Sequence, residues 1–162
     1  YSIKQEGMTV SLKEDLRYIE SYMSILKMRF GSRLSYETRI PDELMRRRIP
    51  KLLVQPVLEN AVKYGMEKKR ELKIEIEARC VGERLEISIR DNGPGIEPEV
   101  METPTRYMEN PDMERKTSFG LTNVHDRLRL MYGERYGIRI QTQQGRTTEV
   151  VLSLPGGEGE TE

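Results

Sequence analysis

Residues 84–96 read RLEISIRDNGPGI. Apolar and polar residues alternate over 84–91, which predicts a strand with one buried face that ends at Asp91. An Asp-Asn-Gly turn explains the sequence from Asp91 to Gly93 but leaves Gly95 unexplained. Glycines let the backbone take unusual dihedral angles and approach a flat ring closely. We therefore expect the chain to leave room for a ligand at this point.

The rest of the chain predicts helices and paired strands around this turn. Apolar residues recur at helical spacing in three segments and alternate in five. Because most strands come in hairpins, we expect an α+β fold, an α/β sandwich whose mixed, mostly antiparallel sheet is covered on one face by helices. The helices are expected at 11–30, about 56–65 and 120–133, and the strands at 34–40, 71–80, 84–91, 136–143 and 147–154.

Composition narrows the class of protein. The 162 residues carry 27 Lys+Arg and 27 Asp+Glu, so the formal net charge is zero, which argues against a nucleic-acid backbone binder. We find no run of eighteen apolar residues and no signal peptide, and we expect a cytoplasmic domain. Cys80 falls in an alternating pattern and is interpreted as a small buried residue rather than a reactive thiol. The charged residues 42–48 are interpreted as a solvated link rather than an anion-binding patch.

Three motifs bring chemically useful groups together. In LENAVKYG (58–65), helical spacing places Asn60, Lys63 and Tyr64 on one face. An amide oxygen suits Mg²⁺ and a lysine suits phosphate, although a plain polar stripe on an amphipathic helix explains the same pattern. Residues 117–128 begin another helix, whose N-terminus favours phosphate but also fits ordinary capping.

The Asp91 carboxylate needs hydrogen-bond donors if it is buried at the end of its strand. The exocyclic amine of a nucleobase is one such donor. Together the three motifs offer groups for a base, for a metal with phosphates, and for an anion at a helix N-terminus.

The order LENAVKYG, DNGPGI, FGLTNV and GRTT (58–148) resembles the N, G1 and G2 boxes and the final strand pair of the ATP-binding domain of sensor histidine kinases. These belong to the GHKL superfamily, which has the Bergerat ATP-binding fold. The longer stretches PKLLVQPVLENAVKYG and NVHDRLRLMYGERYGIRI look like the LytS/YesM-like subgroup. The resemblance covers roughly residues 10–155.

The resemblance implies roles for the helix that carries the first motif. Asn60 would ligate Mg²⁺, Lys63 would contact the phosphates of ATP, and Tyr64 would line the same pocket. Glu59 would help to orient the attacking group or a water molecule.

It also implies which residues hold the base. Asp91 would accept the adenine amine, and Gly93, Gly95 and Ile96 would shape the base pocket. Thr148 would lie on a strand near the adenine.

The polar segment 97–118 would be the ATP lid, hinged near Gly95 and Gly120. Phe119, Gly120 and Leu121 would meet the phosphates. The G2 box of the family often reads Gly-x-Gly-Leu, and this chain has Ser118 in place of the first glycine. That departure puts the closing geometry of the lid in question.

Two further observations separate the kinase from related activities. Gyrase-, Hsp90- and MutL-like ATPases carry a catalytic glutamate four residues before the asparagine of the N box, where this chain has Pro56. The single histidine, His125, is interpreted as a surface or helix-face residue and not as the phosphoacceptor. The acceptor would lie outside this chain.

By this resemblance, residues 1–32 are a helical segment, possibly the tail of the dimerisation region. Residues 33–155 are the ATP-binding catalytic domain, and 156–162 are a disordered tail. The domain would take Mg-ATP and pass the γ-phosphate to a histidine of the parent protein, for transfer to a response regulator. The parent would be a homodimer anchored in the cell membrane. The alternatives are a GHKL ATPase, an anti-sigma-like serine kinase, and an interaction module without nucleotide.

Overall fold

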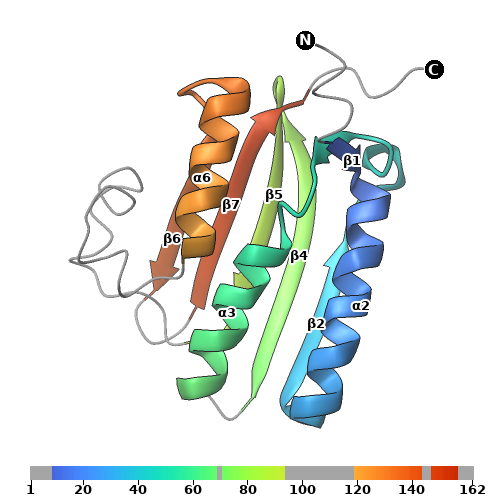
Figure 1. Cartoon of the computed structure of the whole chain (residues 1–162), viewed down its shortest axis with the longest axis vertical. Helices are drawn as coiled ribbons and strands as arrows, with labels where there is room; N and C mark the ends of the chain where they lie inside the picture. The colour runs from blue at the N-terminus through green and yellow to red at the C-terminus, as the bar shows by residue number, and fades with distance from the viewer. Residues whose placement is uncertain (1–8, 69–70, 94–118, 144–146, 157–162) are drawn as a thin grey trace.

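The computed structural model describes residues 9–68, 71–93, 119–143 and 147–156. Five of its strands form one sheet in the order β2-β4-β5-β7-β6 (Figure 1). β2 runs parallel to β4, and every other neighbouring pair in this sheet is antiparallel. The strands cover Leu34–Arg39 (β2), Leu72–Val81 (β4), Arg84–Asp91 (β5), Gly137–Gln143 (β6) and Thr147–Pro155 (β7).

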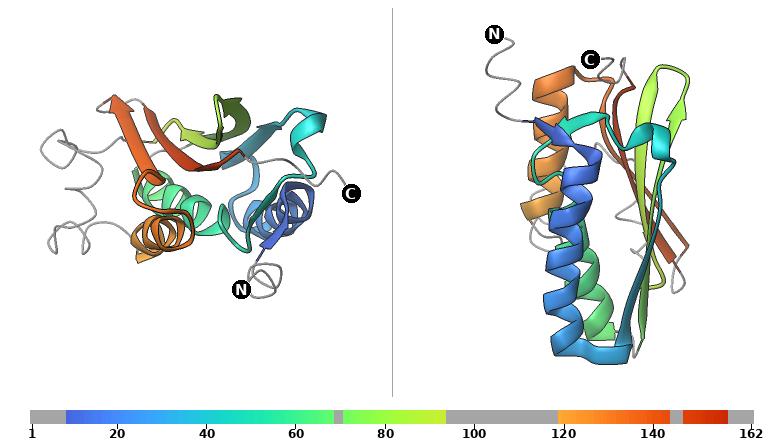
Figure 2. Two further views of the ribbon diagram at one scale, coloured as in Figure 1. Left: turned by 90° about the horizontal axis from the view of Figure 1, so that it is seen from above. Right: turned by 90° about the vertical axis from the view of Figure 1, so that its right-hand side faces the viewer.

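Helices cover one face of this sheet, which gives the two-layer sandwich that the sequence predicts (Figure 2). They are α2 (Leu12–Phe30), α3 (Gln55–Lys68) and α6 (Phe119–Tyr132). The fold class is therefore confirmed, with β5 at the centre of a mixed, mostly antiparallel sheet. Within the described residues, no helix is long and apolar enough to cross a membrane.

The first helix belongs to the same core as the sheet. Ser11 caps it by accepting a hydrogen bond from the backbone N–H of Glu14 at 3.1 Å. Its apolar stripe joins the buried side chains of the strands in one cluster, because positions three and four apart share a helix face. The stripe consists of Leu12, Leu16, Ile19 and Met23. The predicted domain boundary between residues 32 and 33 is not tested by this packing and remains a prediction.

The segment between β2 and α3 is more ordered than a solvated link. It contains a 3-10 turn, η2 (Asp42–Leu44), and a short strand, β3 (Arg48–Pro50), which pairs with β1 (Thr9–Ser11). Arg48 donates to the backbone carbonyl of Thr9 at 2.8 Å. The sequence signal missed this pairing because strands of three residues show no periodicity.

Two further expectations need correction. α3 continues past Gly65 to Lys68, because this glycine packs against a strand instead of ending the helix. Cys80 is exposed, so its interpretation as a buried residue is wrong. The alternation of β4 places it on the same face as the buried Ala78, but the last three residues of the strand are exposed.

Candidate functional site

Asp91 is the last residue of the central strand β5, and its side chain is only 8% exposed. Burial raises the pKa of this carboxyl to about 6, and the hydrogen bond from the backbone N–H of Gly93 lowers it in part. That N–H donates to Oδ1 of Asp91 at 2.7 Å. No other described residue donates a hydrogen bond to this carboxylate. One of its oxygens is therefore suited to a donor that comes from a ligand.

The turn after Asp91 is fixed to the neighbouring strand. The side-chain oxygen of Asn92 accepts from the N–H of Lys73 at 2.8 Å, and the N–H of Asn92 donates to the carbonyl of Lys73 at 3.3 Å. A Cβ on Gly93 would lie 2.6 Å from Oδ1 of Asp91. Only a glycine fits this tight turn without moving the carboxylate. The expected close approach of this backbone to a flat ring stays a prediction.

Gly65 brings α3 onto the same corner of the molecule. A Cβ at Gly65 would lie 2.5 Å from the side chain of Leu72, and a Cβ at Gly93 would lie 3.6 Å from the Cα of Gly65. Two glycines thus let the backbone of the helix approach the strand and the turn. From the sequence, Gly65 is expected to end the helix. A glycine inside a helical pattern was the signal for close packing.

Thr148 lies directly opposite Asp91 on β7, the strand that pairs with β5 on the side away from β4. The two residues pair in the register of β5 and β7, and Thr148 is 9% exposed. Residues paired across strands point to the same face of the sheet. Asp91 and Thr148 therefore form a buried polar pair on the helix-covered face of an otherwise apolar sheet.

The polar residues of α3 differ in their exposure. Asn60 and Tyr64 are half-buried and Lys63 is exposed. The Lys63 ammonium lies 5.6 Å from the centre of the Tyr64 ring, within reach of a cation–π contact. The structure therefore brings Lys63 and Tyr64 together, and the expectation that Asn60 shares one site with them stays a prediction. Asn60 takes part in polar contacts of its own.

The start of α6 supplies backbone groups. Phe119 and Gly120 are its first two residues, and Leu121 is 1% exposed in the core. A helix leaves its first N–H groups without partners within the helix. Since the side chain of Leu121 is buried, this residue can meet a phosphate only through its backbone.

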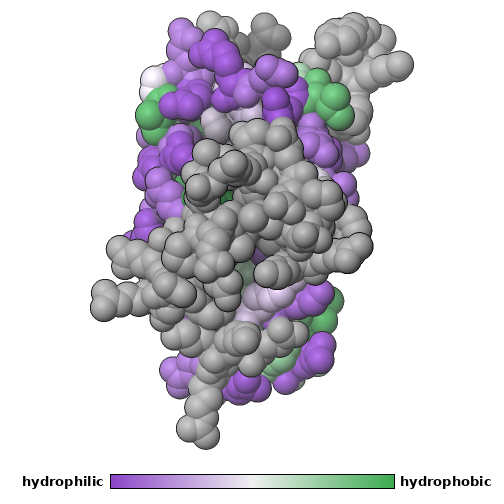
Figure 3. All heavy atoms as spheres, turned by 90° about the vertical axis from the view of Figure 1, so that its left-hand side faces the viewer, coloured by the Kyte–Doolittle hydropathy of each residue, from purple (hydrophilic) through white to green (hydrophobic). Residues whose placement is uncertain are grey.

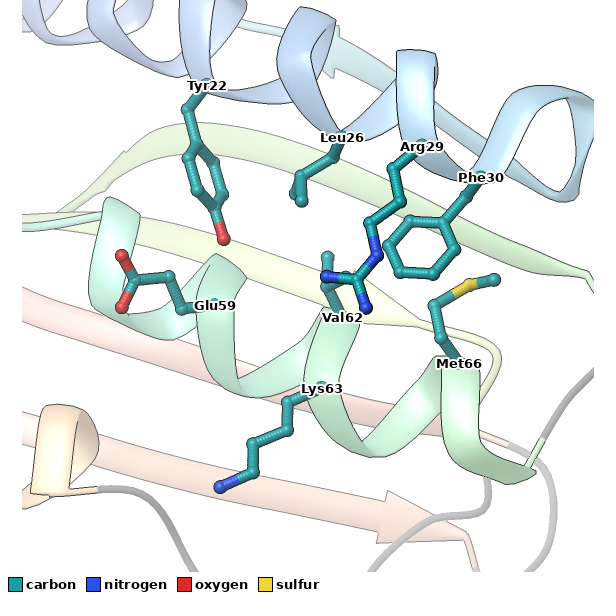
Figure 4. A pocket seen from close by; sticks show the side chains of 8 residues that line it. All are labelled: Tyr22, Leu26, Arg29, Phe30, Glu59, Val62, Lys63 and Met66. Carbon is teal, nitrogen blue, oxygen red and sulfur yellow. The ribbon is translucent and has the colours of Figure 1, made fainter.

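Glu59 lines a groove between α2 and α3 (Figure 4). Its carboxylate accepts a hydrogen bond from the side chain of Gln55 at 3.2 Å. Burial, and then the charge of Glu59, raise the pKa of Tyr22 on α2. The groove encloses about 370 Å³, and the Lys63 side chain extends away from the other labelled residues at its edge. The contacts that the structure shows for Glu59 are therefore with its own helix and with α2.

Several expected site residues lie outside the described residues. They are Gly95, Ile96, Ser118, the lid at 97–118 and residues 157–162 of the tail expected at 156–162. Gly156, the first residue of that tail, is buried and its carbonyl accepts a hydrogen bond from Arg47 at 2.6 Å, so the expectation of disorder is wrong at this position. Within the described residues, no group of three or more His, Cys, Asp or Glu could hold a metal ion. The chemistry of the donor set fits Mg²⁺ only through the amide oxygen of Asn60, completed by oxygens of a phosphate ligand.

His125 is buried, so the expectation of a surface histidine is wrong and that of a helix-face histidine is right. Its side chain is 6% exposed, and Nδ1 accepts a hydrogen bond from the N–H of Ile138 at 2.9 Å. A Cβ on Gly137 would lie 2.7 Å from the imidazole ring. The ring therefore joins α6 to the start of β6.

The chain is similar to known proteins over most of its length. A family model described as histidine kinase-, DNA gyrase B-, and HSP90-like ATPase matches residues 46–158. The sensor histidine kinase YesM of Bacillus subtilis (strain 168) is 32% identical over 155 residues, which are 95% of this chain and 25% of YesM. An uncharacterized sensor-like histidine kinase of Staphylococcus epidermidis (strain ATCC 12228 / FDA PCI 1200) is 33% identical over 155 residues, 96% of this chain and 30% of that protein.

The chain therefore spans about a quarter to a third of the length of these curated relatives. Among solved structures, a nucleotide-free catalytic domain of the histidine kinase ThkA matches with a TM-score of 0.68. The two chains are 17% identical, and the match covers 91% of this chain and 95% of ThkA's domain. At this level of identity the likeness concerns the fold.

Proposed function

The chain belongs to the family of histidine kinase-, DNA gyrase B- and HSP90-like ATPases, and we propose that it is the ATP-binding catalytic domain of a sensor histidine kinase. In this proposal it binds Mg-ATP and delivers the γ-phosphate to a histidine outside this chain. Sequence similarity to sensor histidine kinases along 95% of the chain supports the kinase over the other members of the family.

The observation that carries the proposal is the buried carboxylate of Asp91. It lies at the end of the central strand, receives one hydrogen bond from its own turn, and has an oxygen left to accept from a ligand. An exocyclic amine of adenine is a donor of the right kind. Gly93 and Gly65 keep side chains out of the corner beside it, which gives a flat ring access to the carboxylate.

The phosphates would lie between α3 and the start of α6, two helices that pack against each other. Asn60 would hold Mg²⁺, Lys63 would contact phosphate oxygens, and the first N–H groups of α6 would face them. Mg²⁺ when bound supplies neutralisation of the phosphate charge. The residues of the chain position the nucleotide, and positioning is most of what catalysis of phosphoryl transfer requires.

The state of His125 supports an acceptor outside this chain. It is the only histidine in the sequence, it is 6% exposed, and its Nδ1 already accepts from Ile138. A buried imidazole joined to a strand cannot reach a γ-phosphate without opening the contact between α6 and β6. In this proposal the acceptor histidine belongs to the parent protein, a homodimer anchored in the membrane, and a response regulator receives the phosphate.

The direct test is calorimetry of the chain with ADP and Mg²⁺. Wild type is expected to bind, and Asp91→Asn to bind about 10- to 100-fold more weakly, because a hydrogen bond to a charged group contributes about 1.5–3 kcal/mol. Asp126→Asn, an exposed aspartate on α6, is the matched control and should keep wild-type affinity. Absence of binding by wild type would favour an interaction module without nucleotide. Equal affinity of Asp91→Asn would refute the base pocket.

The second test follows the phosphate. The chain is incubated with labelled ATP, and its peptides are mapped for phosphohistidine. We expect no label at His125, since its ring is buried. Label at His125 that disappears in His125→Gln would contradict the proposal that the acceptor lies elsewhere.

A further inference from the structure

A cavity of about 270 Å³ lies where α6 ends and β6 begins. Its lining is strongly basic, although the chain as a whole carries no net charge. Figure 3 looks at the α6 and β6 side of the molecule, and hydrophilic residues gather at the upper end of this face, where the two elements are joined. The charged and hydroxyl side chains that line the cavity are Arg84, Arg129, Glu134, Arg135, Tyr136, Arg139 and Ser153.

The positive charge of this lining is only partly balanced. Arg129 pairs with Glu134 at 3.5 Å, and Arg139 pairs with Glu86 at 3.6 Å. Arg84 and Arg135 form no ion pair within the part of the chain that the structure describes. Two guanidinium groups at one small cavity thus carry charge that no described carboxylate neutralises.

The carboxylate of Glu86 does not supply the missing charge. It lies opposite Ser153 in the register of β5 and β7 and is 3% exposed. Arg79 contacts one of its oxygens at 3.3 Å, and Arg139 contacts the other. Because Glu86 is already shared by two arginines, it leaves the excess charge of the cavity in place.

Two residues that line the cavity also bury polar atoms that lack partners among the described residues. Ser153 is 8% exposed, and its hydroxyl has no hydrogen-bond partner among the described residues. The Nε of Arg139 is buried and has none either. Burying a polar group without a hydrogen bond costs about 1–3 kcal/mol. Arg139 and Ser153 both line the cavity, so a small shift of either side chain would let an acceptor from a ligand reach its buried donor.

We propose that this cavity is a second ligand site, which binds a small tetrahedral oxyanion of the phosphate type. Its donors come from β5, β6, β7 and the end of α6, so they approach from several directions. A tetrahedral ion offers oxygens in all of them, whereas a carboxylate offers two in one plane. Arginine forks match phosphate oxygens well. A volume near the lower limit for ligand pockets fits a small ion.

The site lies apart from the candidate nucleotide site. Arg129 is in the last turn of α6 and Arg135 follows that helix, whereas the phosphate groups of a nucleotide would lie at its first turn. The two sites therefore differ in every residue, and they can be tested separately.

The test is a titration of the ¹⁵N-labelled chain with inorganic phosphate and pyrophosphate by NMR, with acetate at equal ionic strength as the planar control. We expect saturable shifts at the amides of Gly137, Ile138 and Ser153 with phosphate or pyrophosphate and not with acetate. Arg84→Gln combined with Arg135→Gln is expected to weaken affinity at least tenfold. Ser153→Ala is expected to weaken it several-fold without changing any charge.

The matched control is Arg17→Gln combined with Arg46→Gln, which removes the same charge from two exposed sites elsewhere. It should leave the affinity unchanged, and Asp91→Asn should do the same. The inference is overturned by an absence of saturable shifts, by equal weakening in the control, or by shifts confined to residues around Lys63 and Gly93. If the arginine variant does not fold, unchanged affinity in Ser153→Ala overturns it as well.

Discussion

Asp15 and Asp91 are two buried aspartates at opposite ends of α3. Asp15, on α2, is 2% exposed and lies beside the segment that leads into α3, while Asp91 lies beside Gly65 in its last turns. Burial raises the pKa of each carboxyl to about 6. The cost of burial is therefore similar at the two positions, and the difference lies in what surrounds each carboxylate.

Asp15 is surrounded by groups of the protein itself. After burial, hydrogen bonding with the backbone at Leu52 and Val54 and the charge of Arg127 lower its pKa in part, and its Oδ2 is buried without a hydrogen-bond partner among the described residues. Leu52 has a positive φ of 55°, and Arg127 also donates to the carbonyl of Lys51 at 2.7 Å. Asp15 thus packs against the segment before α3, in which Leu52 has a left-handed backbone conformation. No positive charge of the described residues lowers the pKa of Asp91, which has only the N–H of Gly93. The two carboxylates therefore differ in the cation beside them, and a buried acid without such a cation is the better indication of a ligand.

The largest effect we expect concerns stability against pH. Each aspartate holds its proton in the folded chain up to about pH 6, whereas in the unfolded chain its pKa is near 3.8. The folded state binds more protons between these values, so stability falls as pH rises from about 4 to 6. Each group contributes up to about 3 kcal/mol, since one pKa unit corresponds to about 1.4 kcal/mol.

Chemical denaturation of wild type, Asp15→Asn and Asp91→Asn across this pH range measures the two contributions. Each variant should lack the part of the pH-dependent loss of stability that its own aspartate causes in wild type. Glu149 acts in the opposite sense: burial raises its pKa, but hydrogen bonds from Ser88 and Arg90 outweigh this and lower it. The comparison is therefore made between variants and wild type. Saturating ADP and Mg²⁺ should remove the contribution of Asp91 to this pH dependence and leave the contribution of Asp15. If the nucleotide removes both contributions, the two carboxylates do not differ in the way that we infer.

An intermediate effect is expected at Gly65. Gly65→Ala places a Cβ against the buried side chain of Leu72 and should destabilise the chain by about 1–3 kcal/mol, as overpacking does. It should also weaken ADP binding, because Gly65 adjoins Gly93. Gly82→Ala is the control, since its Cβ would have no neighbour within 4 Å. This variant should lose stability only because alanine disfavours the positive φ at this position. Its affinity for ADP should not change. Equal ADP affinity in both variants would place the nucleotide away from this corner.

The smallest effect is expected for Glu59→Gln. Its carboxylate faces Gln55 and Tyr22 in the groove beside α2. ADP affinity measured by calorimetry should stay within about twofold of wild type, a difference below about 0.5 kcal/mol. ATP hydrolysis by the isolated chain that depends on Glu59 would instead favour a GHKL ATPase.

Strong periodic signals in the sequence predicted most of the fold. The alternation in residues 84–91 gave β5 its correct bounds, and the spacing in 11–30 gave the first helix and its Ser11 cap. Asp91 was correctly expected at the end of a buried strand. The pairing of β1 with β3 was not predictable because three-residue strands carry no pattern.

The contacts of single side chains were less accessible to sequence reasoning. Asp15 was missed, although it stands between Leu12 and Ile19 on the apolar stripe of its helix. The burial of His125 and the exposure of Cys80 depend on which segments pack above them, and local periodicity does not carry that information. The orientation of Glu59 toward α2 likewise follows from the packing of two helices, which the spacing in 58–65 leaves open.

The role of Asp91 is tested most directly by comparing ADP with inosine diphosphate, which carries an oxygen where adenine has its exocyclic amine. Calorimetry with Mg²⁺ on wild type and Asp91→Asn gives four affinities. A carboxylate that accepts from the amine predicts that wild type prefers ADP by about 10- to 100-fold and that Asp91→Asn loses most of this preference. Equal affinity of wild type for the two nucleotides, or a preference that Asp91→Asn retains in full, would contradict it.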